Sequence, residues 1–84
     1  MDIGDTVNGQ DILAVRVTAG ADDVEDGSRP AVLYAAAQHA REWITPEMTR
    51  RLLHHYLDQY RTNRTIKKVI DTQELWFVLV ANPD

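Results

Sequence analysis

The hydrophobic pattern at the start of the chain predicts two strands joined by a tight turn. Residues 3–7 and the longer run 10–19 flank Asn8-Gly9, a strong hairpin signal because both residue types tolerate positive φ. Apolar side chains fall on both sides of the second strand, so neither side is purely polar. We therefore expect a sheet that is covered on at least one face.

Two uninterrupted apolar runs, residues 31–37 and 75–81, predict strands that are buried on both faces. Residues 20–30, which precede the first of them, are rich in acidic and turn-forming residues and predict an exposed loop without chemistry. The second run ends at Asn82-Pro83, because proline cannot donate to a strand ladder.

A long helix is predicted between the two apolar runs. Thr45 suits its N-cap and Pro46 its first helical position, while Glu47 places negative charge at the positive end of the helix dipole. One face of the helix gathers Met48, Leu52, Leu53, Tyr56, Leu57 and Tyr60. Residues 62–71 predict a shorter second helix.

The order of three strands, two helices and one strand predicts an α/β fold. Two strands that need cover on both faces require more helices than this pattern supplies, and a chain of 84 residues builds only a small core. We therefore expect residues 1–84 to be a single incomplete unit of a larger domain.

Composition and charge exclude several classes of function. The net charge of −4 argues against a nucleic-acid binder, and no apolar window approaches the ~18 residues of a membrane span. The chain has no cysteine, and its first residues lack the pattern of a secretory signal.

The basic residues gather at Arg50, Arg51, Arg61, Arg64, Lys67 and Lys68. They suit a solvated helix face better than an anion-binding patch.

The candidate chemistry lies between the buried strand and the long helix, where His39, Arg41 and Glu42 are crowded together. Loops at the carboxyl ends of strands are common ligand sites in α/β proteins. A histidine and a glutamate three positions apart can provide zinc with one nitrogen and one or two oxygens. The same spacing also fits a surface histidine paired with a carboxylate.

The wider sequence resembles a known family. Residues 38–47, Gln-His-Ala-Arg-Glu-Trp-Ile-Thr-Pro-Glu, resemble the zinc-binding motif of the zinc carboxypeptidases of the carboxypeptidase A and B type. Residues 4–12 are similar to that family's opening hairpin, and residues 80–84 to its next strand end. The resemblance covers nearly the whole chain in the same order. It implies the N-terminal part of a catalytic domain, with its hairpin and two buried strands in a mixed central sheet and one long and one short helix.

The resemblance also implies specific roles. His39 and Glu42 would be two of three protein ligands to one catalytic Zn²⁺, and Arg41 a substrate-binding cation beside it. The parent protein would be a secreted exopeptidase that acts on the C-termini of peptides or proteins. Trp43 is expected to pack under the loop.

The family's third ligand, a histidine, and its glutamate general base come later in such sequences, so no catalytic residue is expected within this chain. His54 and His55 are poor substitutes for the third ligand, because they lie on or beside the polar face of the long helix. We expect the 84 residues alone to be inactive.

Two alternatives remain open. The chain could be a non-catalytic α/β interaction module that retains the His-x-x-Glu loop, in which case its exposed sheet surface predicts self-association. It could instead bind an anionic partner through the basic residues of the helices, with an affinity that falls as salt rises.

Overall fold

A computed structural model of the chain describes residues 1–39 and 41–84. In chain order the elements are β1 (Asp2–Asp5), β2 (Asp11–Leu13), β3 (Val15–Val17), the short 3-10 helix η1 (Ala21–Asp23), β4 (Ala31–Ala35), α1 (Ile44–Gln59), α2 (Arg64–Thr72) and β5 (Glu74–Val78). The fold is α/β, as predicted. Ala40, which is part of the family-like motif, lies outside the described residues.

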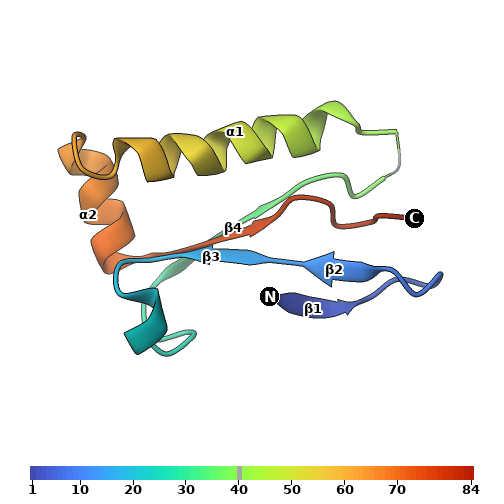
Figure 1. The fold of residues 1–84 in the computed structure, drawn as a ribbon, viewed down its shortest axis with the longest axis horizontal. Helices are drawn as coiled ribbons and strands as arrows, with labels where there is room; N and C mark the ends of the chain where they lie inside the picture. The colour runs from blue at the N-terminus through green and yellow to red at the C-terminus, as the bar shows by residue number, and fades with distance from the viewer. Residues whose placement is uncertain (40) are drawn as a thin grey trace.

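The strands form two sheets (Figure 1). β1 and β2 make the antiparallel hairpin that Asn8-Gly9 predicts, and Gly9 adopts a φ of 83° in its turn. The second sheet is mixed, because β5 lies at its centre, antiparallel to β3 and parallel to β4. The single long strand predicted over residues 10–19 is wrong. It is two strands in different sheets, separated by Ala14, whose N–H donates to the carbonyl of Met1 at 2.8 Å.

The two apolar strands differ in their burial. β5 is buried along most of its length, as predicted, and Phe77 has no exposed surface. β4 is largely exposed, with 66% of Leu33 accessible, so the expectation that it is covered on both faces is wrong for this chain. The cause is position: β4 is an edge strand with one neighbour, whereas β5 has a neighbour on each side.

The core lies between the sheet and the helices. Its buried members are Val17, Leu53, Ile66, Ile70, Leu75 and Phe77. Leu75 and Phe77 are two positions apart on β5 and therefore share a face. α1 runs alongside the sheet and α2 crosses its end (Figure 1). Two helices thus cover one face of the sheet, as the short helical content of the sequence implies.

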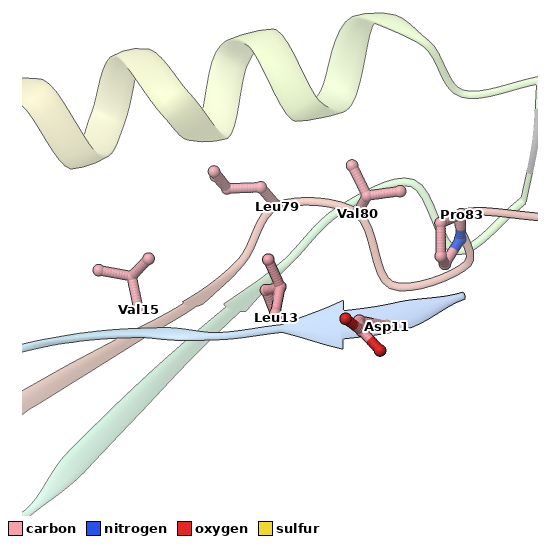
Figure 2. Close-up of a pocket in the computed structure, with 6 residues that line it drawn as sticks. All are labelled: Asp11, Leu13, Val15, Leu79, Val80 and Pro83. Carbon is pink, nitrogen blue, oxygen red and sulfur yellow. The ribbon is translucent and has the colours of Figure 1, made fainter. Parts of the chain in front are cut away.

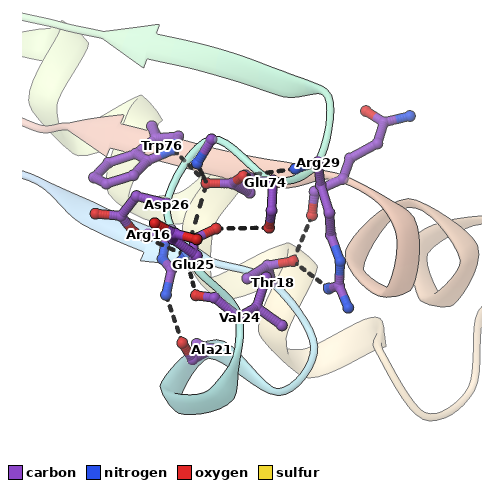
Figure 3. A network of polar contacts seen from close by, with 12 residues as sticks. Arg16, Thr18, Ala21, Val24, Glu25, Asp26, Arg29, Glu74 and Trp76 are labelled. Atoms are coloured by element: carbon purple, nitrogen blue, oxygen red, sulfur yellow. Dashed lines mark hydrogen bonds and ion pairs between the residues drawn. The ribbon is translucent and has the colours of Figure 1, made fainter.

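A buried carboxylate organises the other face and the acidic loop over residues 20–30 (Figure 3). Glu74 has no exposed surface and accepts the backbone N–H groups of Gly27 at 3.2 Å and Arg29 at 3.1 Å. The indole N–H of Trp76 also donates to it at 3.3 Å, and Arg16 pairs with it at 3.7 Å. The backbone donors are the main reason that the pKa of Glu74 is lowered.

The start of α1 differs from the sequence expectation in two respects, and the first is that Pro46 is the third residue of the helix and not its first. α1 begins at Ile44 with Trp43 at its N-cap and no side-chain cap, so the prediction that Thr45 caps this helix is wrong. α2 begins at Arg64, where the Asn63 side chain accepts the N–H groups of residues 65 and 66. Neither described helix has the length and apolar character needed to cross a bilayer.

Candidate metal centre

The loop between β4 and α1 leaves the sheet at the edge where β5 also ends. β4 and β5 are parallel, so their carboxyl ends lie together. The pairing continues past both strands: the N–H of Ala36 donates to the carbonyl of Val78 at 3.0 Å, and that of Ala81 to the carbonyl of Ala36 at 2.8 Å. This is the sheet edge where α/β proteins usually place their ligand sites.

The structure brings His39 and Glu42 together. Nδ1 of His39 lies 3.4 Å from Oε1 of Glu42, and the side chains are 79% and 43% exposed. The backbone reinforces this approach. The His39 N–H donates to Oε1 of Glu42 at 2.9 Å, and the Glu42 N–H donates to the His39 carbonyl at 3.0 Å. Nδ1 of His39 and Oε1 of Glu42, two atoms that can coordinate a metal, therefore lie close together where solvent and ligands can reach them.

The electrostatics of the pair favour an ionised carboxylate. The backbone N–H of His39 is the largest influence that lowers the pKa of Glu42, and the hydrogen bond to the His39 side chain adds to it. A carboxylate that stays ionised is an acceptor of the kind that a divalent cation requires.

The separation of Nδ1 and Oε1 is one that two ligands of a tetrahedral zinc ion could have. Zinc ligands at about 2.0–2.2 Å place a nitrogen and an oxygen about 3.4 Å from each other. The observed separation of 3.4 Å matches that value, and it is longer than the ~2.7–2.9 Å of a charge-assisted hydrogen bond. The donor set of one imidazole and one carboxylate is also one that zinc accepts.

The other residues singled out in the sequence have different positions. Arg41 is exposed in the same loop as the pair. Trp43, at the N-cap of α1, is 80% exposed, so the expectation that it packs under the loop is wrong. His54 and His55 are exposed on α1. At ~1.5 Å of rise per residue, His54 lies roughly 15 Å along the helix from Ile44, too far to join the pair.

Two residues near the pair escaped the sequence analysis as contributors to the loop. The hydroxyl of Thr45 accepts the N–H of Ala37 at 2.9 Å and donates to the carbonyl of Glu42 at 2.8 Å. Asn82 donates its backbone N–H to the carbonyl of Ala37 at 3.0 Å and its side-chain amide to the carbonyl of Gln38 at 3.4 Å. A polar residue directly after a central strand, at the same edge as the motif, is the signal that could have pointed to Asn82.

A groove of about 310 Å³ lies between β2, β3 and the segment that follows β5 (Figure 2). Its lining is Asp11, Leu13, Val15, Leu79, Val80 and Pro83. The lining is almost wholly apolar and contains neither member of the His39 and Glu42 pair. Its lining is therefore distinct from the candidate metal centre.

Comparison with known proteins agrees with the sequence motif. The profile of the family described as zinc carboxypeptidase matches residues 1–84. A zinc carboxypeptidase of Saccharothrix mutabilis subsp. capreolus is 35% identical over 82 residues, which are 98% of this chain and 18% of that protein. Metallocarboxypeptidase A of Trichophyton rubrum is 31% identical over 84 residues, which are 100% of the chain and 19% of that protein. Zinc carboxypeptidase A 1 of Drosophila melanogaster is 34% identical over 82 residues, which are 96% of this chain and 18% of that protein. The chain thus spans less than a fifth of the length of these relatives.

Proposed function

The chain belongs to the zinc carboxypeptidase family, and from this membership we propose that His39 and Glu42 are two protein ligands of one catalytic zinc ion. The whole protein would be a metallocarboxypeptidase that hydrolyses the C-terminal peptide bond of peptides or proteins. The observation that carries the proposal is the 3.4 Å approach of Nδ1 of His39 to Oε1 of Glu42 in an exposed loop.

Each residue of the loop has a part in this chemistry. Bound zinc would polarise the scissile carbonyl and lower the pKa of a coordinated water toward ~7. His39 and Glu42 would hold the ion at the sheet edge, and the negative charge of Glu42 would offset part of its charge. Arg41, exposed in the same loop, would donate two parallel hydrogen bonds to a substrate carbonyl or carboxylate.

Residues outside this chain would complete the site. Within residues 1–39 and 41–84, His54 and His55 lie along α1 and not beside the pair, which supports the proposal that the third ligand would come from elsewhere in the parent protein. The general base likewise comes from elsewhere. We therefore propose that the 84 residues are inactive alone, and that the parent is a secreted enzyme, which rests on the family resemblance.

Zinc binding by the purified chain tests the assignment of the ligands. With two protein ligands we expect a dissociation constant no tighter than about micromolar, measured by equilibrium dialysis. His39→Ala and Glu42→Gln should each abolish binding, whereas the matched controls His54→Ala and Glu25→Gln should leave it unchanged. Binding that survives His39→Ala would contradict the proposal.

Hydrolysis of a C-terminal peptide substrate tests the division of the site between this chain and the rest of the protein. We expect no turnover by the chain with added zinc. Turnover that His39→Ala abolishes would show that the chain holds a complete site and that the missing ligand and base have been assigned wrongly.

A second candidate function is a non-catalytic interaction module. The apolar groove between β2, β3 and the segment after β5 favours it, together with the exposed Leu33 of the edge strand. Light scattering and an unfolding titration separate this module from a piece of a larger domain. A clean monomer with one cooperative unfolding transition favours a self-sufficient module, whereas an oligomer or a molten species favours a piece of a larger domain.

The basic residues of the helices give less support to an anion-binding function. Arg50 and Arg51 both pair with Glu47, at 2.6 and 3.1 Å, and Lys67 pairs with Asp71 at 3.1 Å. Half of the six cations in the helical segment are thus engaged with two carboxylates of their own helices, which is the pattern of a solvated helix face.

A further inference from the structure

Ala37, two residues after the end of β4 and just before the loop that carries His39 and Glu42, has an unusual backbone conformation. Its φ is 52°, and it is the one residue other than glycine with positive φ in the described parts of the chain. A side chain with a Cβ is disfavoured there and remains there only when its surroundings fix it. Ala37 is buried, its N–H donates to the hydroxyl of Thr45, and its carbonyl accepts the N–H of Asn82. Both sides of this residue are therefore held in place.

Thr45 connects this corner to a proposed metal ligand. Its Oγ1 accepts the Ala37 N–H at 2.9 Å and donates to the Glu42 carbonyl at 2.8 Å. The backbone N–H of Thr45 donates to the same carbonyl at 3.1 Å. The Thr45 hydroxyl thus connects Ala37, at the start of the loop, to Glu42, near its end. No side-chain cap at the start of α1 adds to this connection.

We propose that Thr45 is a positioning residue for the metal centre. Its hydroxyl fixes the backbone of Glu42 and thereby directs the Glu42 carboxylate toward His39. The inference rests on the proposed function of the pair. Its physical basis is that partners of the ligands orient them, and that a ligand fixed in advance loses less conformational freedom when the metal binds.

Three substitutions separate this role from a general effect on stability. Thr45→Val removes the hydroxyl and keeps the branched shape, whereas Thr45→Ser keeps the hydroxyl and removes the methyl group. Thr72→Val is the matched control, because the hydroxyl of Thr72 also donates to a backbone carbonyl, that of Lys68 at 2.6 Å, at the end of α2. Zinc affinity is read from the His39 ring signals by NMR, and the free energy of unfolding from denaturant titration without metal.

We expect Thr45→Val to weaken zinc binding by at least about tenfold, the usual loss when a partner of a metal ligand is removed. Thr45→Ser should stay within about threefold of the wild-type affinity, and Thr72→Val should match the wild type although its stability also falls. If Thr45→Val does not fold, Thr45→Ala carries the same test, because the residue is only partly buried and tolerates a smaller side chain.

The outcomes distinguish this inference from the function on which it rests. Wild-type affinity in a folded Thr45→Val or Thr45→Ala variant would overturn the positioning role and leave the ligand assignment intact. Equal weakening in Thr72→Val would also overturn it, since the effect would then follow stability. A wild-type chain whose His39 signals do not respond to zinc would overturn the ligand assignment and the positioning role together.

Discussion

The hydroxyl groups of Tyr34 on β4 and Tyr56 on α1 lie 3.0 Å apart and form a hydrogen bond between the edge strand and the long helix. Tyr34 also stacks on Phe77 with ring centroids 5.1 Å apart. The pair therefore links β4 to the second half of α1 and holds the helix over the sheet. The hydrogen bond to Tyr34 is the main cause that raises the pKa of Tyr56 to about 12.

This hydrogen bond predicts a loss of stability at alkaline pH. A phenol whose pKa rises on folding stabilises the fold fully below its unfolded pKa of ~10, and that contribution is lost as the pH rises toward 12. Absorbance of the phenolate should show one tyrosine that ionises near pH 12, and unfolding should become easier over the same range. Tyr34→Phe should return the pKa of Tyr56 toward ~10 and cost about 0.5–1.5 kcal/mol at neutral pH. An unchanged titration in Tyr34→Phe would show that the pair does not form in solution.

The core makes a second prediction. Phe77 has no exposed surface and packs among residues from both helices and β3. Phe77→Ala should lower the free energy of unfolding by about 3–5 kcal/mol, because the transfer free energy is lost and a cavity remains. Leu33→Ala on the exposed edge strand is the control and should cost no more than about 0.5 kcal/mol. Chemical denaturation measures both, and similar losses would mean that β4 is covered in solution.

The short second helix makes a third prediction. The side chain of Asn63 accepts the N–H groups of Thr65 at 3.0 Å and Ile66 at 3.2 Å. Asn63→Ala should cost about 1 kcal/mol in unfolding free energy, whereas Asn63→Asp should restore most of it, because aspartate is an equally good N-cap. Ile66 and Ile70 anchor this helix in the core, so a larger loss from Asn63→Ala would indicate that the cap also determines their packing.

The strands and helices could be predicted from the sequence because their signals are local. The Asn8-Gly9 turn, the apolar run before Asn82 and the helical spacing of apolar residues each depend on a few neighbours. The break at Ala14 could not be predicted, because it arises from pairing with two different partners, β1 and β5. The exposure of β4 depends likewise on its place at the edge of the sheet, which is a property of the whole arrangement.

The candidate site likewise combines features that could be predicted from the sequence with features that could not. The approach of His39 to Glu42 was predicted, because a spacing of three positions in one loop brings two side chains to a common point. The roles of Thr45 and Asn82 were missed, because they depend on where β4, β5 and α1 meet. Trp43 was misplaced for a related reason: a large aromatic packs only where the fold provides a partner, and here it is exposed at the helix start.

The buried carboxylate of Glu74 makes the last prediction. Its pKa is lowered in the fold, chiefly by the N–H groups of Arg29 and Gly27, so the stability it contributes is present above its unfolded pKa of ~4.3 and is lost as the pH falls below that value. Glu74→Gln should lower the thermal midpoint at pH 7 and reduce the loss of stability on acidification. An amide does not ionise, and its single acceptor oxygen cannot accept both the Gly27 N–H, which donates to Oε1, and the Arg29 N–H, which donates to Oε2. Asp58→Asn on the exposed face of α1 is the matched control and should leave both the midpoint and its acid dependence unchanged. Thermal unfolding between pH 3 and pH 7, followed by circular dichroism, measures both quantities. If Glu74→Gln keeps the wild-type acid dependence, other carboxylates cause it, and the loop over residues 20–30 is held by its backbone contacts rather than by the charge of Glu74.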